Sequence, residues 1–146
     1  MKPQPIIVGL DGTTLDASVL AVAVDQAALT GATLRLVHGM TAEPSADGSG
    51  SSVTAARRAE ITAMTDDLKR QVTKATGGAS PAVEYEVRHG DPATVLLAAA
   101  RNAALIIVGT RGSGGGSPFL LGPVSQDVAV HASIPVLLVP TAAPER

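Results

Sequence analysis

LIIVGTRGSGGGSPFLLGPVS, residues 105–125, runs from an apolar segment through a glycine-rich loop to a proline that is typical of a helix start. Six of the fourteen residues from Gly109 to Gly122 are glycine, so backbone N–H groups can approach a ligand without obstruction by a Cβ atom. A helix that begins near Gly122 would add the partial positive charge of its N-terminus. The stretch therefore predicts a strand, an anion-binding loop and a helix in succession, an arrangement that suits phosphate.

Apolar runs and polar alternation predict five strands along the chain. Residues 5–10 and 105–108 are continuous apolar runs, which are typical of strands that helices cover on both faces. Residues 33–38 predict a further strand. Residues 83–88 alternate apolar and charged side chains, which predicts a strand with one wet face near a sheet edge. Residues 135–140 predict a last strand with a proline at each end.

Helical patterns lie between these strands. Apolar positions recur at helical spacing over residues 16–29, and Gly31 follows where a left-handed C-cap belongs. Residues 53–76 contain no Gly or Pro and carry many charges, which predicts a longer, exposed helix. Asp91 before a proline predicts a capped helix over residues 92–102. The last helix is predicted directly after the glycine-rich loop.

Strict alternation of strands and helices implies right-handed crossovers and a doubly wound parallel sheet of the α/β class. In such a sheet, ligands bind at the carboxyl ends of the strands where the winding direction reverses. Asp11 follows the first strand, and Gly109 follows the strand at 105–108. If these two strands are neighbours, the glycine-rich loop and the winding reversal select the same crevice.

The composition describes one domain, 1–146, with an aliphatic core. Apolar residues make up 45% of the chain and aromatic residues 1%, so Ala, Val, Leu and Ile must fill that core. A formal net charge of −2 and the near absence of rings argue against nucleic-acid binding. The chain has no cysteine, which excludes disulfides and thiolate metal sites. The apolar run at residues 6–10 is too short for the hydrophobic region of a signal peptide or for a membrane span. We therefore expect a cytoplasmic protein.

The sequence favours binding over catalysis. His38, His89 and His131 do not form a site by their spacing, and we interpret them as structural or solvated. Ser125 has no local His or acidic partner, and no cluster of metal ligands appears. The glycine-rich loop lacks the Gly-Lys-Ser/Thr of a P-loop, so no lysine is present there to stabilise phosphoryl transfer.

Five short segments spread over nearly the whole chain form a recognisable set. They are Val8-Gly9-Leu10-Asp11-Gly12, Leu36-Val37-His38, Gly90-Asp91-Pro92, Gly109-Thr110-Arg111-Gly112 and Ile134-Pro135-Val136-Leu137-Leu138-Val139. Together they resemble the universal stress protein family. The resemblance implies a Rossmann-like fold, similar to the adenine nucleotide alpha hydrolases, with helices on both faces of the sheet. It also implies ATP, AMP or cyclic AMP as ligand, with Mg²⁺ accompanying ATP.

The nucleotide-binding members of that family carry Gly, two residues, Gly, nine residues, Gly and then Ser or Thr. Gly109, Gly112 and Gly122 match this motif. Position 123 is Pro, which has neither a hydroxyl nor a backbone N–H, so one phosphate donor of the pattern is absent. Ser125 matches the second hydroxyl of the pattern.

The resemblance also places Asp11 and the backbone around Gly39 on the adenosine side, where Gly39 replaces a larger aliphatic residue and so loosens the adenine contact. We expect the nucleotide site to comprise Asp11, Gly39, Val108, Gly109, Arg111, Gly112, Gly122, Val124 and Ser125.

Most of these residues also have a structural interpretation. Gly109 and Gly112 either approach phosphate or allow a tight strand exit. Asp11 either contacts the nucleotide or caps a turn, and Arg111 either contacts phosphate or is solvated. Ser125 either binds phosphate or satisfies the first turn of the helix.

We expect an adenine-nucleotide-binding stress-response or regulatory protein without efficient catalysis. A protein adaptor with a degenerate nucleotide pocket and a slow ATPase are the alternatives. Residues 136–139 are apolar and are expected at a sheet edge, so we predict a homodimer through this strand, a contact that the resemblance also implies. Residues 39–52 are either a lid over the site or a solvated insertion.

Overall fold

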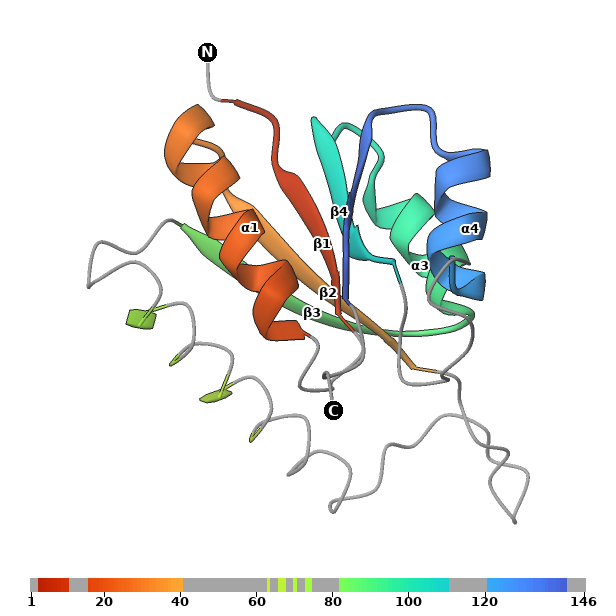
Figure 1. Cartoon of the computed structure of the whole chain (residues 1–146), viewed down its shortest axis with the longest axis horizontal. Helices are drawn as coiled ribbons and strands as arrows, with labels where there is room; N and C mark the ends of the chain where they lie inside the picture. The colour runs from red at the N-terminus through yellow and green to blue at the C-terminus, as the bar shows by residue number, and fades with distance from the viewer. Residues whose placement is uncertain are drawn as a thin grey trace.

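The computed structural model of the chain describes residues 3–10, 16–40, 82–110 and 121–141, together with residues 63, 66, 67, 70, 73 and 74. At Asp16, Gly39, Met40, Val87 and His89, only the backbone is described. In this part of the chain, parallel strands form one sheet in the order β3-β2-β1-β4-β5 (Figure 1). The strands are β1 (Ile6–Leu10), β2 (Leu34–Met40), β3 (Val83–His89), β4 (Leu105–Gly109) and β5 (Val136–Val139), and the helices are α1 (Asp16–Thr30), α3 (Pro92–Ala99) and α4 (Pro123–His131).

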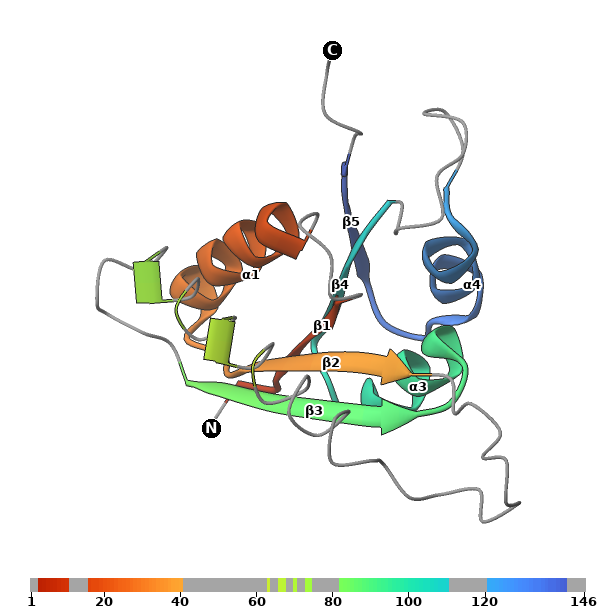
Figure 2. The ribbon, with the colours of Figure 1, turned by 90° about the horizontal axis from the view of Figure 1, so that it is seen from below.

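Helices cover both faces of the sheet. α1 packs on one face, and α3 and α4 pack on the other (Figure 2). The six described residues between 63 and 74 are helical, in agreement with the helix predicted over residues 53–76, most of which lies outside the described residues. The predicted α/β class with a doubly wound parallel sheet is confirmed.

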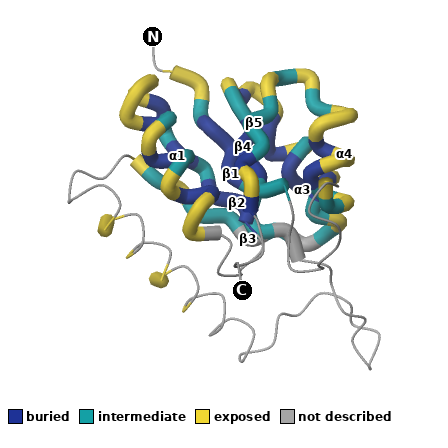
Figure 3. Tube along the Cα trace, viewed as in Figure 1, coloured by how far each residue is buried: buried dark blue, intermediate teal, exposed yellow. Residues whose placement is uncertain are grey.

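The two central strands are buried on both faces (Figure 3). On β1, Ile7 and Val8 are 0% exposed, and on β4 the same holds for Ile106 and Ile107. Successive side chains enter opposite cores: Val8 and Ile107 pack with the core under α1, whereas Ile7 and Ile106 pack with the core under α3 and α4. This double burial explains why these runs are continuous rather than alternating in hydrophobicity.

β3 is an edge strand with one charged face, as its alternating sequence predicts. Arg35 of β2 lies between Glu84 and Glu86, with Nε–Oε distances of 3.0 Å and 3.6 Å. Arg88 pairs with Glu86 at 2.8 Å. These side chains stay partly in water, so each pair contributes little to stability. Their charges protect the edge of the sheet against pairing with other chains.

The ends of α1 and of α3 follow local chemistry. Gly31 follows α1 with a φ of 74°, the left-handed cap that the sequence predicts. α3 begins as predicted, because Asp91 Oδ2 accepts a hydrogen bond from the N–H of Thr94 at 3.1 Å. The sequence predicts its end near Asn102, but the helix ends at Ala99, with Ala100 as C-cap at φ −78° and ψ −3°. Asn102, with a left-handed φ of 64°, lies in the turn that follows.

β2 is longer than predicted. The sequence predicts its end at His38, but the strand continues to Met40. Gly39 and Met40 pair in register with Arg88 and His89 of β3, so the neighbouring strand extends the ladder. Gly39 and Met40, the first residues of the segment predicted to be unstructured, therefore belong to a strand, and residues 41–52 lie outside the described residues.

Candidate functional site

The winding direction of the sheet reverses between β1 and β4. The chain passes from β1 to β2 and β3 on one side, and β4 and β5 continue on the other side. β1 and β4 are hydrogen-bonded neighbours, with Ile6 opposite Leu105 and Val8 opposite Ile107. The sequence left open whether these two strands are neighbours, and the structure shows that they are. Their carboxyl ends mark the position where α/β sheets bind ligands.

The glycine-rich loop begins and ends at one point beside this reversal. The N–H of Gly122 donates a hydrogen bond to the carbonyl oxygen of Thr110 at 2.7 Å. Ser125 Oγ donates to the same oxygen at 2.9 Å and lies 3.1 Å from the carbonyl oxygen of Gly122. We call Thr110, Gly122 and Ser125 the loop base, because these three residues join the end of β4 to the start of α4.

Thr110 also ties the loop base to the end of β5. Its N–H donates to the carbonyl oxygen of Val139 at 2.9 Å, and its Oγ1 accepts from the N–H of Thr141 at 3.2 Å. Thr141 is 3% exposed. Thr110 is therefore held in place by the end of β5 and by Thr141, which lies two residues after that strand.

The N-terminus of α4 offers two backbone donors to a ligand. Gly122 is the N-cap, and its N–H is paired with Thr110. Pro123 has no N–H, and the first helical hydrogen bond runs from Gln126 to Gly122. Within the described chain, the N–H groups of Val124 and Ser125 have no acceptor, which is usual for the first turn of a helix. Such groups favour an anion.

The glycines of the site have different structural reasons. A Cβ at Gly109 would lie 2.8 Å from Thr141 Cγ2 and 3.3 Å from Val19 Cγ2, so packing alone requires a glycine there. Gly122 has φ −68° and ψ 166°, a conformation that any residue adopts. A positive φ is therefore not the reason for glycine at position 122.

Six of the nine predicted site residues lie in the described part of the chain. Gly109, Gly122, Val124 and Ser125 are brought together around the loop base. Gly39 lies on β2, one position beyond the pairing of Leu10 with His38, at the same end of the sheet on the other side of β1.

Val108 is buried on β4. Its side chain is 3% exposed and packs with the core under α3 and α4, so this side chain serves the core rather than an open site. Asp11, Arg111 and Gly112 lie outside the described residues.

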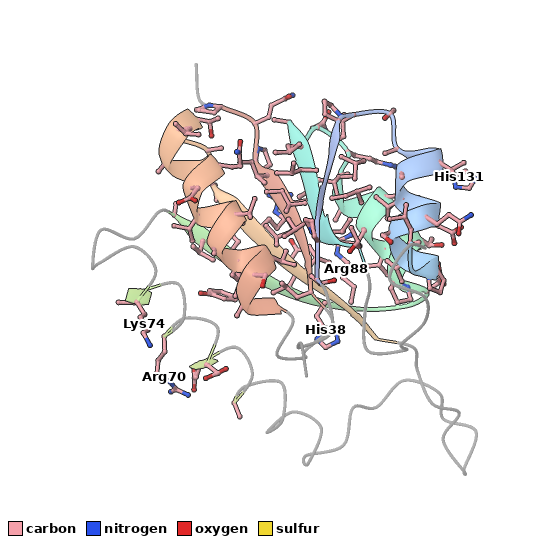
Figure 4. All side chains as sticks on the ribbon, in the orientation of Figure 1. His38, Arg70, Lys74, Arg88 and His131 are labelled. Carbon is pink, nitrogen blue, oxygen red and sulfur yellow. The ribbon has the colours of Figure 1, made fainter. Side chains whose placement is uncertain are left out.

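The histidines contribute no shared site in the part that is described. His131 is exposed at the end of α4, with Nδ1 3.0 Å from the carbonyl oxygen of Asp127, whereas His38 lies at the carboxyl end of β2 (Figure 4). Among the described residues, no three His, Asp or Glu side chains are grouped as metal ligands. No helix found there has the length and apolar character needed to cross a membrane.

The sequence interpretation missed Thr110 and Thr141 as residues that shape this site. Thr110 acts through its backbone groups as well as its hydroxyl, and every residue type carries backbone groups. No residue pattern signals such a role. The close packing of Thr141 on Gly109 depends on the tertiary fold.

The family model described as universal stress protein family matches residues 3–140. This chain belongs to the universal stress protein family. Universal stress protein Rv2028c of Mycobacterium tuberculosis is 32% identical over 139 residues, which cover 94% of this chain and 48% of the relative. The chain therefore spans about half the length of the curated universal stress proteins that it matches.

Solved structures of universal stress proteins share the fold. A universal stress protein in complex with cAMP has a TM-score of 0.71 and 24% identity, over 97% of this chain and 100% of the other. The universal stress protein from Archaeoglobus fulgidus in complex with dAMP has a TM-score of 0.67 and 21% identity, over 95% of this chain and 99% of the other. These likenesses confirm the Rossmann-like fold.

Proposed function

We propose that this universal stress protein binds an adenine nucleotide at the carboxyl ends of β1 and β4, and that occupancy regulates its state or its partner. One observation carries the proposal. The glycine-rich loop starts and ends at the loop base, beside the winding reversal and beside two N–H groups of α4 that have no acceptor among the described residues. Fold and local chemistry thus favour an anionic ligand at the same point.

The relatives support a nucleotide with few phosphates. The two solved universal stress proteins described above hold cAMP and dAMP, each of which has one phosphate group. In this chain, Val124 and Ser125 supply two N–H donors at α4, and Pro123 removes a third. Such a donor set suits a single phosphate, so we expect little discrimination between AMP and ATP, with Mg²⁺ bound only alongside ATP.

The proposed pocket divides between the two sides of β1. Gly39 at the end of β2 would face the adenosine, together with Asp11, and the loop base with Arg111 and Gly112 would face the phosphate. Gly39 has no side chain to hold the adenine ring. We therefore propose weaker adenosine contacts than a larger aliphatic residue would provide.

A protein adaptor with a degenerate pocket is a second candidate, because Pro123 replaces a donor at the start of α4. A slow ATPase is a third, and we propose that the chain is not an efficient enzyme, since its loop sequence has no lysine for phosphoryl transfer. For each candidate we propose a cytoplasmic homodimer that associates through β5.

The three candidate functions predict different nucleotide binding and different phosphate release in solution. Freshly purified protein is denatured, and any released nucleotide is identified by mass; the refolded or apo protein is then titrated with AMP and ATP by calorimetry. A nucleotide-binding regulator predicts saturable binding without turnover. An adaptor predicts no binding, and an ATPase predicts phosphate release that a pocket substitution abolishes.

A further inference from the structure

The Ser125 hydroxyl is committed to the protein backbone. Its Oγ lies 2.9 Å from the carbonyl oxygen of Thr110 and 3.1 Å from that of Gly122. Carbonyl oxygens only accept hydrogen bonds, so the serine must be the donor, and it has one proton to share between them. The side chain is buried, because Ser125 is 3% exposed.

A phosphate oxygen would compete for the same proton. A nucleotide phosphate at pH 7 is mainly an acceptor of hydrogen bonds, as the two carbonyl oxygens are. The hydroxyl of Ser125 would have to release Thr110 and Gly122 before it could donate to a phosphate. The N–H groups of Val124 and Ser125, by contrast, have no acceptor in the described chain, so they can bind an anion without breaking a contact.

We propose that Ser125 is a positioning residue that closes the loop base, and that its hydroxyl keeps its bond to Thr110 when the nucleotide binds. The claim that the hydroxyl keeps this bond in the nucleotide complex rests on the proposed function. The phosphate is then held by backbone N–H groups, and Ser125 fixes where those groups lie. This assignment differs from the direct phosphate contact that the family resemblance implies for its hydroxyl.

The hydrogen bonds of Thr110 explain how the bond from Ser125 positions α4 relative to β5. Thr110 is bonded to Val139 through its N–H and to Thr141 through its Oγ1, so its position follows the end of β5. The bonds from Gly122 and Ser125 then fix the N-terminus of α4 relative to that strand.

Hydrogen exchange at single amides tests the closure without any ligand. In the apo full chain, Ser125→Ala removes one of the two bonds to the Thr110 oxygen, while the bond from Gly122 keeps that carbonyl satisfied and the chain folded. We expect the Gly122 amide to exchange about fivefold faster, the size of a typical net hydrogen bond. The Thr110 amide, which is bonded to Val139, should keep its rate. Ser133→Ala is the matched control, because Ser133 is exposed in the turn after α4.

The same measurement with saturating AMP tests where the hydroxyl points in the complex. If Ser125 keeps its bond to Thr110, the ratio of Gly122 rates between Ser125→Ala and the wild type stays near its apo value. A ratio that falls to one on AMP binding assigns the Ser125 hydroxyl to the phosphate and overturns the claim that it keeps its bond to Thr110. Equal exchange rates of the Gly122 amide in the apo wild type and apo Ser125→Ala overturn the proposal that Ser125 closes the loop base. A lack of both AMP and ATP binding in every variant refutes the proposed function and leaves the apo comparison decisive for the closure.

Discussion

Thr141 occupies the space that a side chain at Gly109 would need. A Cβ built on Gly109 lies 2.8 Å from Thr141 Cγ2 and 3.3 Å from Thr141 Oγ1. Thr141 is itself 3% exposed and donates its backbone N–H to Thr110 Oγ1, so its backbone is held in place and its side chain has little free space around it. Packing against Thr141, two residues after β5, thus favours glycine at the first position of the family motif independently of any ligand.

Gly109→Ala should destabilise the fold. The added methyl group overpacks the contact with Thr141, a change that typically costs about 1–3 kcal/mol. Urea unfolding followed by circular dichroism measures the loss as a lower midpoint at an unchanged m-value.

Thr141→Ser provides the matched partner for this prediction, because it removes the Cγ2 that a Cβ at Gly109 would meet at 2.8 Å. The double variant should lose less free energy of unfolding than the sum of the losses in the two single variants, with a coupling of about 1 kcal/mol. Strictly additive losses would show that the strain lies elsewhere.

The parts of the fold that were predictable depend on local patterns. Continuous apolar runs identified β1 and β4 because burial on both faces leaves no polar alternation. Asp91 predicted the start of α3 because its carboxylate caps the first turn of the helix. Alternating order predicted a parallel sheet but not its strand order, so the adjacency of β1 and β4, on which the location of the site depends, came from the structure.

The errors and omissions depend on contacts distant in sequence or on single backbone angles. The extension of β2 through Gly39 requires the partner strand β3, which no local pattern contains. α3 ends at Ala99 and passes into a turn that contains the left-handed residue Asn102, and the residue pattern over 92–102 did not signal this end. The loop base was not predictable because Thr110 and Gly122 meet through backbone atoms, whose hydrogen bonds carry no residue-type signature.

Gly122→Val should weaken nucleotide binding strongly in a folded protein. The backbone at position 122 has φ −68°, which valine adopts, and the bond from its N–H to Thr110 is retained. The branched side chain would enter the space beside the donors of Val124 and Ser125, where close backbone approach to a phosphate is needed. Calorimetry with AMP should show a loss of about tenfold or more.

A smaller side chain provides the control for this prediction. Gly122→Ala should lose less affinity than Gly122→Val, with both variants folded by circular dichroism. Wild-type affinity in a folded Gly122→Val variant would exclude the loop base as the phosphate site.

A homodimer through β5 should depend on the outward N–H of Leu138. β5 donates no bonds from this position to β4, because Ile106 and Thr110 donate to Pro135 and Val139, and parallel pairing alternates residue by residue. Leu138→Pro removes the outward donor while an edge strand tolerates proline. Sedimentation should show a dimer for the wild type and a monomer for the variant.

The surface of α4 offers a control for the dimer. Val130 is 69% exposed on the helix beside β5, and Val130→Lys should leave the association unchanged if β5 alone makes the contact. A wild-type monomer at tens of micromolar would refute the dimer outright.

Pro123 should limit the affinity for triphosphates. As the first residue of α4, it provides neither an N–H nor a hydroxyl at the helix terminus. A hydrogen bond to a charged group contributes about 1.5–3 kcal/mol, so its absence weakens ATP binding by roughly one to two orders of magnitude. The single phosphate of AMP is already served by Val124 and Ser125 and should not reach the same place.

Pro123→Ser should therefore increase ATP affinity at least severalfold and leave AMP affinity nearly unchanged. Pro123→Ala separates the two missing donors, because it restores the backbone N–H without a hydroxyl. If the N–H is the decisive donor, both variants gain equally for ATP; if the hydroxyl is, only the serine variant gains. Calorimetric titration with ATP and AMP, on proteins whose fold is checked by circular dichroism, measures each case. Equal gains for the two nucleotides, or no gain for ATP in either folded variant, would mean that Pro123 does not lie at the phosphate tail.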